Sequence, residues 1–127
     1  MRTENGIEYG DLPKFVDYDY TANVTRLNAA TLASLASAPA PPANVRLLTK
    51  ELQNDSTLAW EPSPGGLATG YEVLWRDSTA AEWQHVKPVG NVAKATLPLS
   101  KDNVVFAVRA LDAKGHRSLA IVPLPER

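Results

Sequence analysis

The sequence lacks cysteine altogether and contains only one methionine and two histidines among its 127 residues. The absence of cysteine excludes disulfides, thiolate zinc sites and cysteine nucleophiles, but it leaves the cellular compartment open. A zinc site needs three or four ligands, usually histidine or cysteine, and His85 and His116 cannot supply them. No serine lies in the GxSxG pattern of a nucleophile elbow. We therefore expect no catalytic residue, no bound metal and no cofactor in this chain.

An excess of charge of one sign and long apolar runs are also missing. The formal net charge is −1 with both signs interspersed, so nothing favours binding to nucleic acid or to an anionic membrane. The apolar stretches are far too short for a transmembrane helix, and the first residues contain no apolar core of signal-peptide length. The chain is therefore expected to be either cytosolic or a piece of a longer protein.

A helical pattern occupies residues 17–36, after a stretch at 1–16 that its glycines and proline predict to be irregular. Asp17 fits an N-cap, and Asp19 places negative charge in the first turn, where the helix dipole favours it. Apolar residues recur at steps of three and four and define one stripe, which comprises Tyr20, Val24, Leu27, Thr31 and Leu35, with Leu32 on its flank. Four members are candidate interaction residues, because an apolar stripe needs a surface to cover. They are Tyr20, Val24, Leu27 and Leu35.

Three prolines between residues 39 and 42 end the helix and predict an extended, semi-rigid linker. Beyond it, apolar and β-branched runs separated by turn signals predict seven strands, at 45–49, 57–61, 70–76, 83–89, 92–97, 104–111 and 119–124. Short strands without intervening helices favour two packed antiparallel sheets. We therefore predict a mainly β chain, in which an N-terminal segment at 1–38 with one α-helix and a linker at 39–42 precede a seven-stranded antiparallel sandwich at 43–127.

The three tryptophans all lie in or beside predicted strands. Trp60 is expected to fill the core of the sandwich, and Trp75 is expected in the core or half-buried. Trp83 lies near a predicted sheet edge, and two interpretations of it stay open. It is either a surface contact for a carbohydrate or a partner domain, or it packs on Pro88 or on a neighbouring strand. Trp83 is thus the fifth candidate interaction residue.

Spaced residues from the end of the linker to the last predicted strand form a second pattern. They are Pro42, Trp60, Gly70-Tyr71-x-Val73, Leu97, Leu99, Val108-x-Ala110 and Gly115-x-x-Ser118. Together they resemble a fibronectin type III domain from residue 42 to about 122, which implies an immunoglobulin-like sandwich. The family usually has a corner tyrosine where this sequence has Val104, so that corner hydrogen bond is expected to be absent. No Arg-Gly-Asp tripeptide is present, so the resemblance does not extend to integrin binding.

The N-terminal segment carries another pattern, Asp11-Leu12-Pro13-Lys14-Phe15-Val16-Asp17, directly before the predicted helix. This D-x-x-x-x-V-D passage is similar to the end of the catalytic domain in bacterial leucyl aminopeptidases and glutamate carboxypeptidase-like zinc peptidases. There it precedes a final helix on the α/β core, and some bacterial members continue through a proline-rich linker into a fibronectin-like domain. The family's zinc-binding histidine would precede Thr3, where position 2 is Arg2, and the other ligands and the general base would lie upstream of Met1.

The two resemblances together imply a non-catalytic C-terminal module of a zinc-dependent aminopeptidase-like protein. Such a module would pack on its own catalytic domain or assist substrate binding, and the protein would be periplasmic or secreted. The alternative is a stand-alone protein–protein interaction domain with the helix as a docking element. In isolation the helix could fold back on the sandwich, swap into a neighbouring chain or fray, and we predict a homodimer through it. Neither nucleic acid nor a membrane is expected as a partner.

Overall fold

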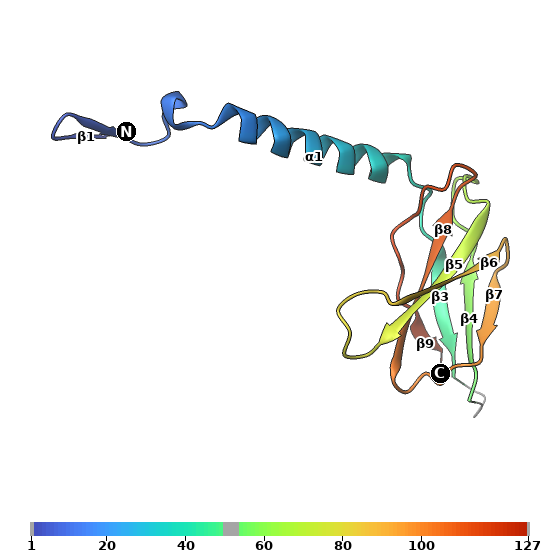
Figure 1. Cartoon of the computed structure of the whole chain (residues 1–127). Coiled ribbons are helices and arrows are strands. Elements are labelled where there is room, and N and C mark those ends of the chain that lie inside the picture. The colour runs from blue at the N-terminus through green and yellow to red at the C-terminus, as the bar shows by residue number, and fades with distance from the viewer. Residues whose placement is uncertain (1, 50–53, 127) are drawn as a thin grey trace. The chain divides into compact units, whose positions relative to one another are not determined.

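The structure, a computed structural model, describes residues 2–49 and 54–126 (Figure 1). The chain divides into two compact units, residues 1–36 and residues 37–127. Among the described residues the first unit holds one α-helix and the second is built from β-strands. No helix in the described ranges is long and apolar enough to cross a membrane. The predicted fold class, mainly β with an N-terminal helix, is confirmed.

The first unit opens with a β-hairpin, where irregular structure is expected from the sequence. β1 (Arg2–Glu4) pairs antiparallel with β2 (Ile7–Tyr9), and the connecting residues Asn5 and Gly6 have φ angles of 50° and 77°. Two consecutive residues with positive φ form a type I′ turn, for which Asn-Gly is a preferred pair. The prediction of irregular structure throughout 1–16 is wrong here, because Gly6 supplies a hairpin turn instead of breaking the structure.

A single turn of 3₁₀ helix, η1 (Pro13–Phe15), leads towards α1 (Tyr18–Ser37). The predicted helix is confirmed, displaced by one residue at each end. The Asp17 carboxylate accepts a hydrogen bond of 2.9 Å from the backbone N–H of Tyr20, which is the predicted N-cap. The helix stops at Ser37 because Pro39 disfavours helical geometry in the residue before it.

The second unit is a sandwich of two sheets (Figure 1). One sheet has the strand order β7-β4-β3-β9 and the other has the order β6-β5-β8. The strands are β3 (Ala43–Leu48), β4 (Ser56–Glu61), β5 (Gly70–Asp77), β6 (His85–Gly90), β7 (Lys94–Leu97), β8 (Val104–Leu111) and β9 (Leu124–Glu126). Apart from the last, the predicted strands agree with these bounds to within two residues at each end.

The core of the sandwich lies between the two sheets. Trp60 on β4 is 3% exposed, and its ring centroid lies 5.6 Å from that of Tyr71 on β5. Trp75 is partly buried against the same cluster, so the expectations for both tryptophans are confirmed. The buried cluster comprises Val45, Leu58, Trp60, Tyr71, Val73, Leu97, Phe106, Val108 and Ala110. The second unit therefore has a hydrophobic core of its own.

The C-terminal segment differs from the predicted antiparallel strand at 119–124. Ile121 forms an isolated antiparallel bridge with Val108, whereas β9 starts at Leu124 and pairs with β3 in parallel. The prediction of an entirely antiparallel arrangement is wrong for this pair. Pro123 lacks the N–H that a longer ladder beside β8 would need, so the pairing ends there and the chain continues on the other sheet.

A serine side chain completes the hydrogen bonding of β8 in this region. Ser118 Oγ accepts the N–H of Ala110 at 2.9 Å and donates to the carbonyl of Leu119 at 2.9 Å. Ser118 is 7% exposed and Ala110 is fully buried. The hydroxyl therefore satisfies a backbone donor that water cannot reach.

Tyr71 makes a cross-link that differs from the corner hydrogen bond of the fibronectin pattern. Its hydroxyl accepts a hydrogen bond of 2.9 Å from the backbone N–H of Ser63, and both residues are buried. Val104 is partly buried against the core and has no hydroxyl to offer. The connection between β4 and β5 is therefore held by a tyrosine of the central strand.

Candidate functional site

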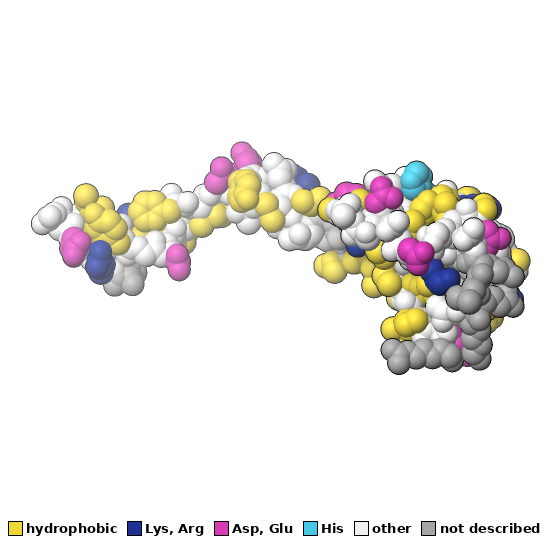
Figure 2. Space-filling view, turned by 90° about the horizontal axis from the view of Figure 1, so that it is seen from below, with side chains coloured by type: hydrophobic (Ala, Val, Ile, Leu, Met, Phe, Trp, Pro, Cys, Tyr) yellow, Lys and Arg dark blue, Asp and Glu magenta, His cyan; other side chains and the backbone are white. Residues whose placement is uncertain are grey.

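The apolar stripe of α1 is exposed along its length. The exposed fractions of the four candidate residues are 68% for Tyr20, 37% for Val24, 67% for Leu27 and 53% for Leu35. None of the described residues 2–36 is buried, and Figure 2 shows hydrophobic side chains, in yellow, on the surface of this unit. A unit of this size that buries no side chain has no core to stabilise it.

The other side of α1 carries small apolar residues, namely Ala22, Ala29, Ala33 and Ala36. With about 3.6 residues per turn, these alanines project to the side opposite the stripe. Asn23 and Arg26 lie between the two faces and are joined by a hydrogen bond of 2.9 Å. A helix that is apolar on two sides is typical of one that is covered on more than one side.

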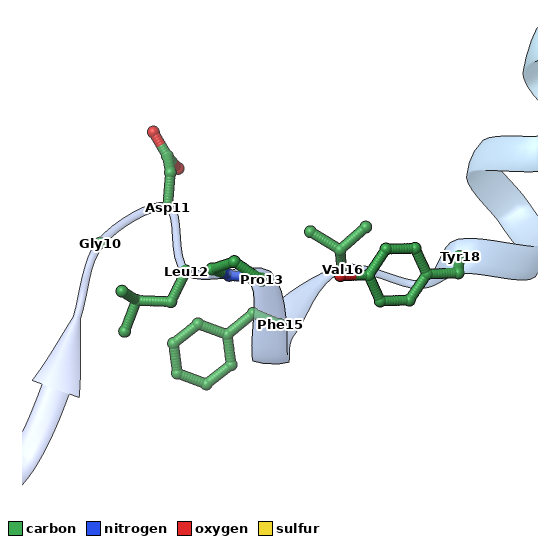
Figure 3. Close-up of a pocket in the computed structure, with 7 residues that line it drawn as sticks. All are labelled: Gly10, Asp11, Leu12, Pro13, Phe15, Val16 and Tyr18. Atoms are coloured by element: carbon green, nitrogen blue, oxygen red, sulfur yellow. The ribbon is translucent and has the colours of Figure 1, made fainter.

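A shallow pocket of about 370 Å³ lies in the segment before α1 (Figure 3). It is lined by Gly10, Asp11, Leu12, Pro13, Phe15, Val16 and Tyr18. In Figure 3 the side chains of Leu12 and Phe15 lie on the same side of the backbone, and that of Asp11 points away from them. Phe15 is 61% exposed and Tyr18 is 67% exposed. The D-x-x-x-x-V-D passage thus extends the exposed apolar surface to residues that precede α1.

Trp83 lies two residues before β6 and is half-buried. The guanidinium carbon of Arg76 lies 5.5 Å from the centroid of its ring, a cation–π arrangement. Arg76 is in turn held by a hydrogen bond from its Nη1 to the carbonyl of Ala80. One face of the Trp83 ring is therefore occupied by a side chain of the neighbouring strand β5.

The most enclosed charged cluster of the sandwich is not among the residues predicted from the sequence. The Glu72 side chain on β5 is 5% exposed and accepts hydrogen bonds from two arginines. Arg109 Nε lies 2.7 Å from Glu72 Oε2, while Arg117 Nε and Nη2 lie 3.2 Å from Oε2 and 3.4 Å from Oε1. Glu72 faces Arg109 in the register of β5 with β8. That register is the signal which could have revealed the cluster, and it is not visible in a single sequence.

The environment of Glu72 fixes its charge. Burial raises the pKa of this carboxyl, but the hydrogen bonds and charges of Arg117 and Arg109 outweigh burial and hold the pKa below its usual value. Glu72 is therefore ionised at neutral pH and bound on both oxygens. A carboxylate held in this way is a poor proton acceptor, so the cluster fastens β8 and the segment after it to β5 rather than providing a general base.

A compact turn follows β8. Asp112 Oδ1 accepts the backbone N–H groups of Lys114 and His116 at 2.8 Å and 2.9 Å, and Oδ2 lies 2.9 Å from His116 Nδ1. The side-chain hydrogen bond with His116 is the largest cause that lowers the pKa of Asp112. The hydroxyl of Ser118 is engaged by the backbone, so Ser118, His116 and Asp112 do not form a nucleophile–base arrangement. The part of the chain that the structure describes contains no group of three or more potential metal ligands.

Solved structures show the class of the second unit. A fibronectin type III-like protein from Clostridium thermocellum aligns with a TM-score of 0.52 and 19% identity, covering 72% of this chain and 97% of that protein. The fibronectin type III domain of the human collagen alpha-1(XX) chain aligns with a TM-score of 0.51 and 25% identity, covering 68% and 82%. No family model matches the chain. The sandwich thus has the fibronectin type III fold.

The relatives in sequence are longer proteins. A probable zinc metalloprotease of Pyrenophora tritici-repentis is 49% identical over 125 residues, which cover 98% of this chain but 26% of that protein. A probable zinc metalloprotease of Leptosphaeria maculans is 48% identical, with 98% and 29% covered. The chain spans about a quarter of the length of the curated relatives it matches. The chain therefore matches a segment of longer probable zinc metalloproteases.

Proposed function

We propose that the chain is the non-catalytic accessory part of a longer zinc-dependent aminopeptidase-like protein. In this proposal residues 1–36 complete the peptidase body. The fibronectin type III sandwich is an interaction module that packs on this body or assists substrate binding. As the resemblance to exported peptidases implies, the longer protein would act outside the cytosol.

The observation that carries the proposal is a first unit without a core. None of its described residues is buried. Its large exposed hydrophobic residues are Ile7, Tyr9, Phe15, Val16, Tyr18, Tyr20, Val24, Leu27, Leu32 and Leu35. Burying one such side chain contributes about 1.5–3 kcal/mol, so a surface that covers several of them would stabilise the unit substantially.

The length of the relatives supports one particular partner for the exposed hydrophobic surface of the first unit, namely the rest of the same polypeptide. Their similarity extends over 98% of the chain, so it includes the first unit together with the sandwich. The greater part of each relative lies outside the matched segment. A body within the same polypeptide is linked to the helix covalently, which raises its effective concentration far above that of a separate partner.

Truncation of the longer polypeptide tests the proposal. A stop codon after Ala36 is expected to leave a folded, zinc-dependent peptidase, since only the accessory module is lost. A stop codon after Gly10 removes the apolar pocket and α1, and we expect an insoluble or inactive product. The proposal fails if the reading frame contains no peptidase region ahead of residue 1. It also fails if the shorter product is as soluble and active as the longer one.

The exposed stripe also supports the second candidate function, a stand-alone interaction domain that pairs with another chain through α1. Light scattering of the 127-residue chain and of residues 37–127 tests whether α1 pairs with a second copy. A homodimer that disappears with the first unit shows that the stripe can bind a second copy. The variant Leu27→Glu should then give a monomer, whereas Ala29→Glu, on the side of the helix opposite the stripe, should not.

A further inference from the structure

The connection between α1 and the sandwich is packed rather than free. α1 ends at Ser37, and Pro39 is buried only two residues later. Pro42 is also buried, and the residues between these prolines are partly buried. The whole proline segment belongs to the same compact unit as the sandwich. Ala38 is therefore the only residue between the last helical position and the packed segment.

The short connection at Ala38 limits the distance between the sandwich and a body on which α1 packs. Two residues span at most about 7 Å even when fully extended. Proline also fixes φ, so the segment from Pro39 to Pro42 does not act as a flexible tether. A body that covers the C-terminal turns of α1 must come close to the end of the sandwich at which the chain enters.

That end, here called the entry pole, comprises the connections 62–69, 91–93 and 112–116. The register of the strands places them together, since Ala43 pairs with Glu61, Tyr71 with Gly90 and Gly70 with Leu111. Figure 1 shows these connections at the end of the sandwich where the chain enters. They lie at the same end of the sandwich as the start of β3, which follows the packed prolines directly.

The entry pole exposes several apolar side chains among polar ones. Leu67 is 65% exposed and Val92 is 41% exposed, and Pro62 and Pro64 are exposed beside them. Neither Leu67 nor Val92 belongs to the buried core cluster or to the hydrophobic residues packed against it. They resemble the apolar centre of a protein–protein contact more than an ordinary solvated loop.

The entry pole is also held in one shape by its own hydrogen bonds. The backbone N–H of Ser63 donates to the Tyr71 hydroxyl, and the N–H of Thr69 donates to the carbonyl of Leu111 at 2.8 Å. Asp112 organises the turn at 112–116. A surface that is already ordered loses little conformational entropy when it binds, which favours a stable contact.

We propose that the entry pole is the surface through which the sandwich packs on the peptidase body of its own polypeptide, with Leu67 and Val92 as the apolar contacts. This inference rests on the proposed function, because it takes α1 to be part of that body. The sandwich is then a fixed extension of the peptidase rather than a flexibly tethered domain.

Site-specific cysteine labelling tests this contact, and the absence of native cysteine from the 127 residues makes the labelling unambiguous here. The variants are Leu67→Cys and Val92→Cys, both at exposed positions, so the sandwich is expected to fold. Thr79→Cys is the matched control, since it is exposed in the connection after β5 at the other end of the sandwich. Maleimide labelling rates are compared between the 127-residue chain and the longer polypeptide, with each site identified by peptide mass.

The proposal predicts that positions 67 and 92 are labelled at least about tenfold more slowly in the longer polypeptide, while position 79 is unchanged. Equal rates at 67 and 92 in the two proteins would overturn it. Leu27→Cys on α1 separates this failure from a failure of the proposed function. Protection of position 27 without protection of positions 67 and 92 would contradict only the entry-pole proposal. Equal labelling rates at position 27 as well would contradict both the entry-pole proposal and the proposed function.

Discussion

Removal of the Glu72 charge is predicted to destabilise the sandwich by about 2 kcal/mol. The Glu72 side chain is 5% exposed and accepts the Arg109 hydrogen bond at 2.7 Å. A hydrogen bond to a charged group contributes about 1.5–3 kcal/mol. The loss stays below the value for a fully buried pair because the side chains of Arg109 and Arg117 are 22% and 53% exposed and can regain water.

Urea unfolding of the 127-residue chain, followed by tryptophan fluorescence, measures this loss. The substitution Glu72→Gln preserves the shape of the side chain, and with a slope of about 1 kcal/mol/M it should lower the midpoint by about 2 M. Glu61→Gln at the exposed end of β4 is the control and should change the free energy of unfolding by less than about 0.5 kcal/mol. The reasoning is refuted if the two variants have the same midpoint.

The same pair of proteins gives a pH dependence with a definite sign. The pKa of Glu72 is lowered in the folded state, so its ionised form stabilises the fold above the unfolded pKa of about 4.3. This stabilisation is lost as the pH falls through the lower folded pKa. The difference in unfolding free energy between wild type and Glu72→Gln should therefore be full at neutral pH and shrink in acid. A difference that does not change with pH would contradict the assignment.

Three further changes test the account of the fold by urea unfolding. Tyr71→Phe removes the acceptor of the Ser63 N–H and should cost about 1–2 kcal/mol; an unchanged midpoint would show that this hydrogen bond does not hold the connection. Ser118→Ala leaves the buried N–H of Ala110 without its acceptor and should cost about 1–3 kcal/mol, whereas Ser100→Ala on an exposed connection should be neutral. Deletion of residues 1–36 should leave the midpoint of the sandwich unchanged, because the second unit has its own core, and a large decrease would show that the helix stabilises it.

Local patterns in the sequence are sufficient for the helix and for most of the strands. The Asp17 cap and the three- and four-residue steps of the stripe place α1 to within one residue. Alternation places the strands because one side of each strand faces a common core. The Asn5-Gly6 turn is also a local signal, and treating its glycine only as a breaker hides the hairpin.

The remaining features depend on contacts between distant parts of the chain. The parallel pairing of β9 with β3 brings together the last and the first strand of the sandwich along the chain. No local pattern distinguishes this pairing from antiparallel pairing with β8. The Glu72 cluster likewise needs the register that places Arg109 opposite Glu72, 37 residues away. The candidate residues of α1 follow from periodicity alone, but what covers them cannot be derived from this chain by itself.

Amide hydrogen exchange of α1 tests most directly whether the first unit belongs to a larger peptidase body. The measurement compares the Tyr18–Ser37 amides in the 127-residue chain with the same amides in the longer polypeptide. The account predicts fast exchange in the short chain, measured at a concentration at which it is monomeric, and protection by at least about a hundredfold in the longer one, because the stripe is then covered. Equal exchange in the two proteins would contradict the central claim.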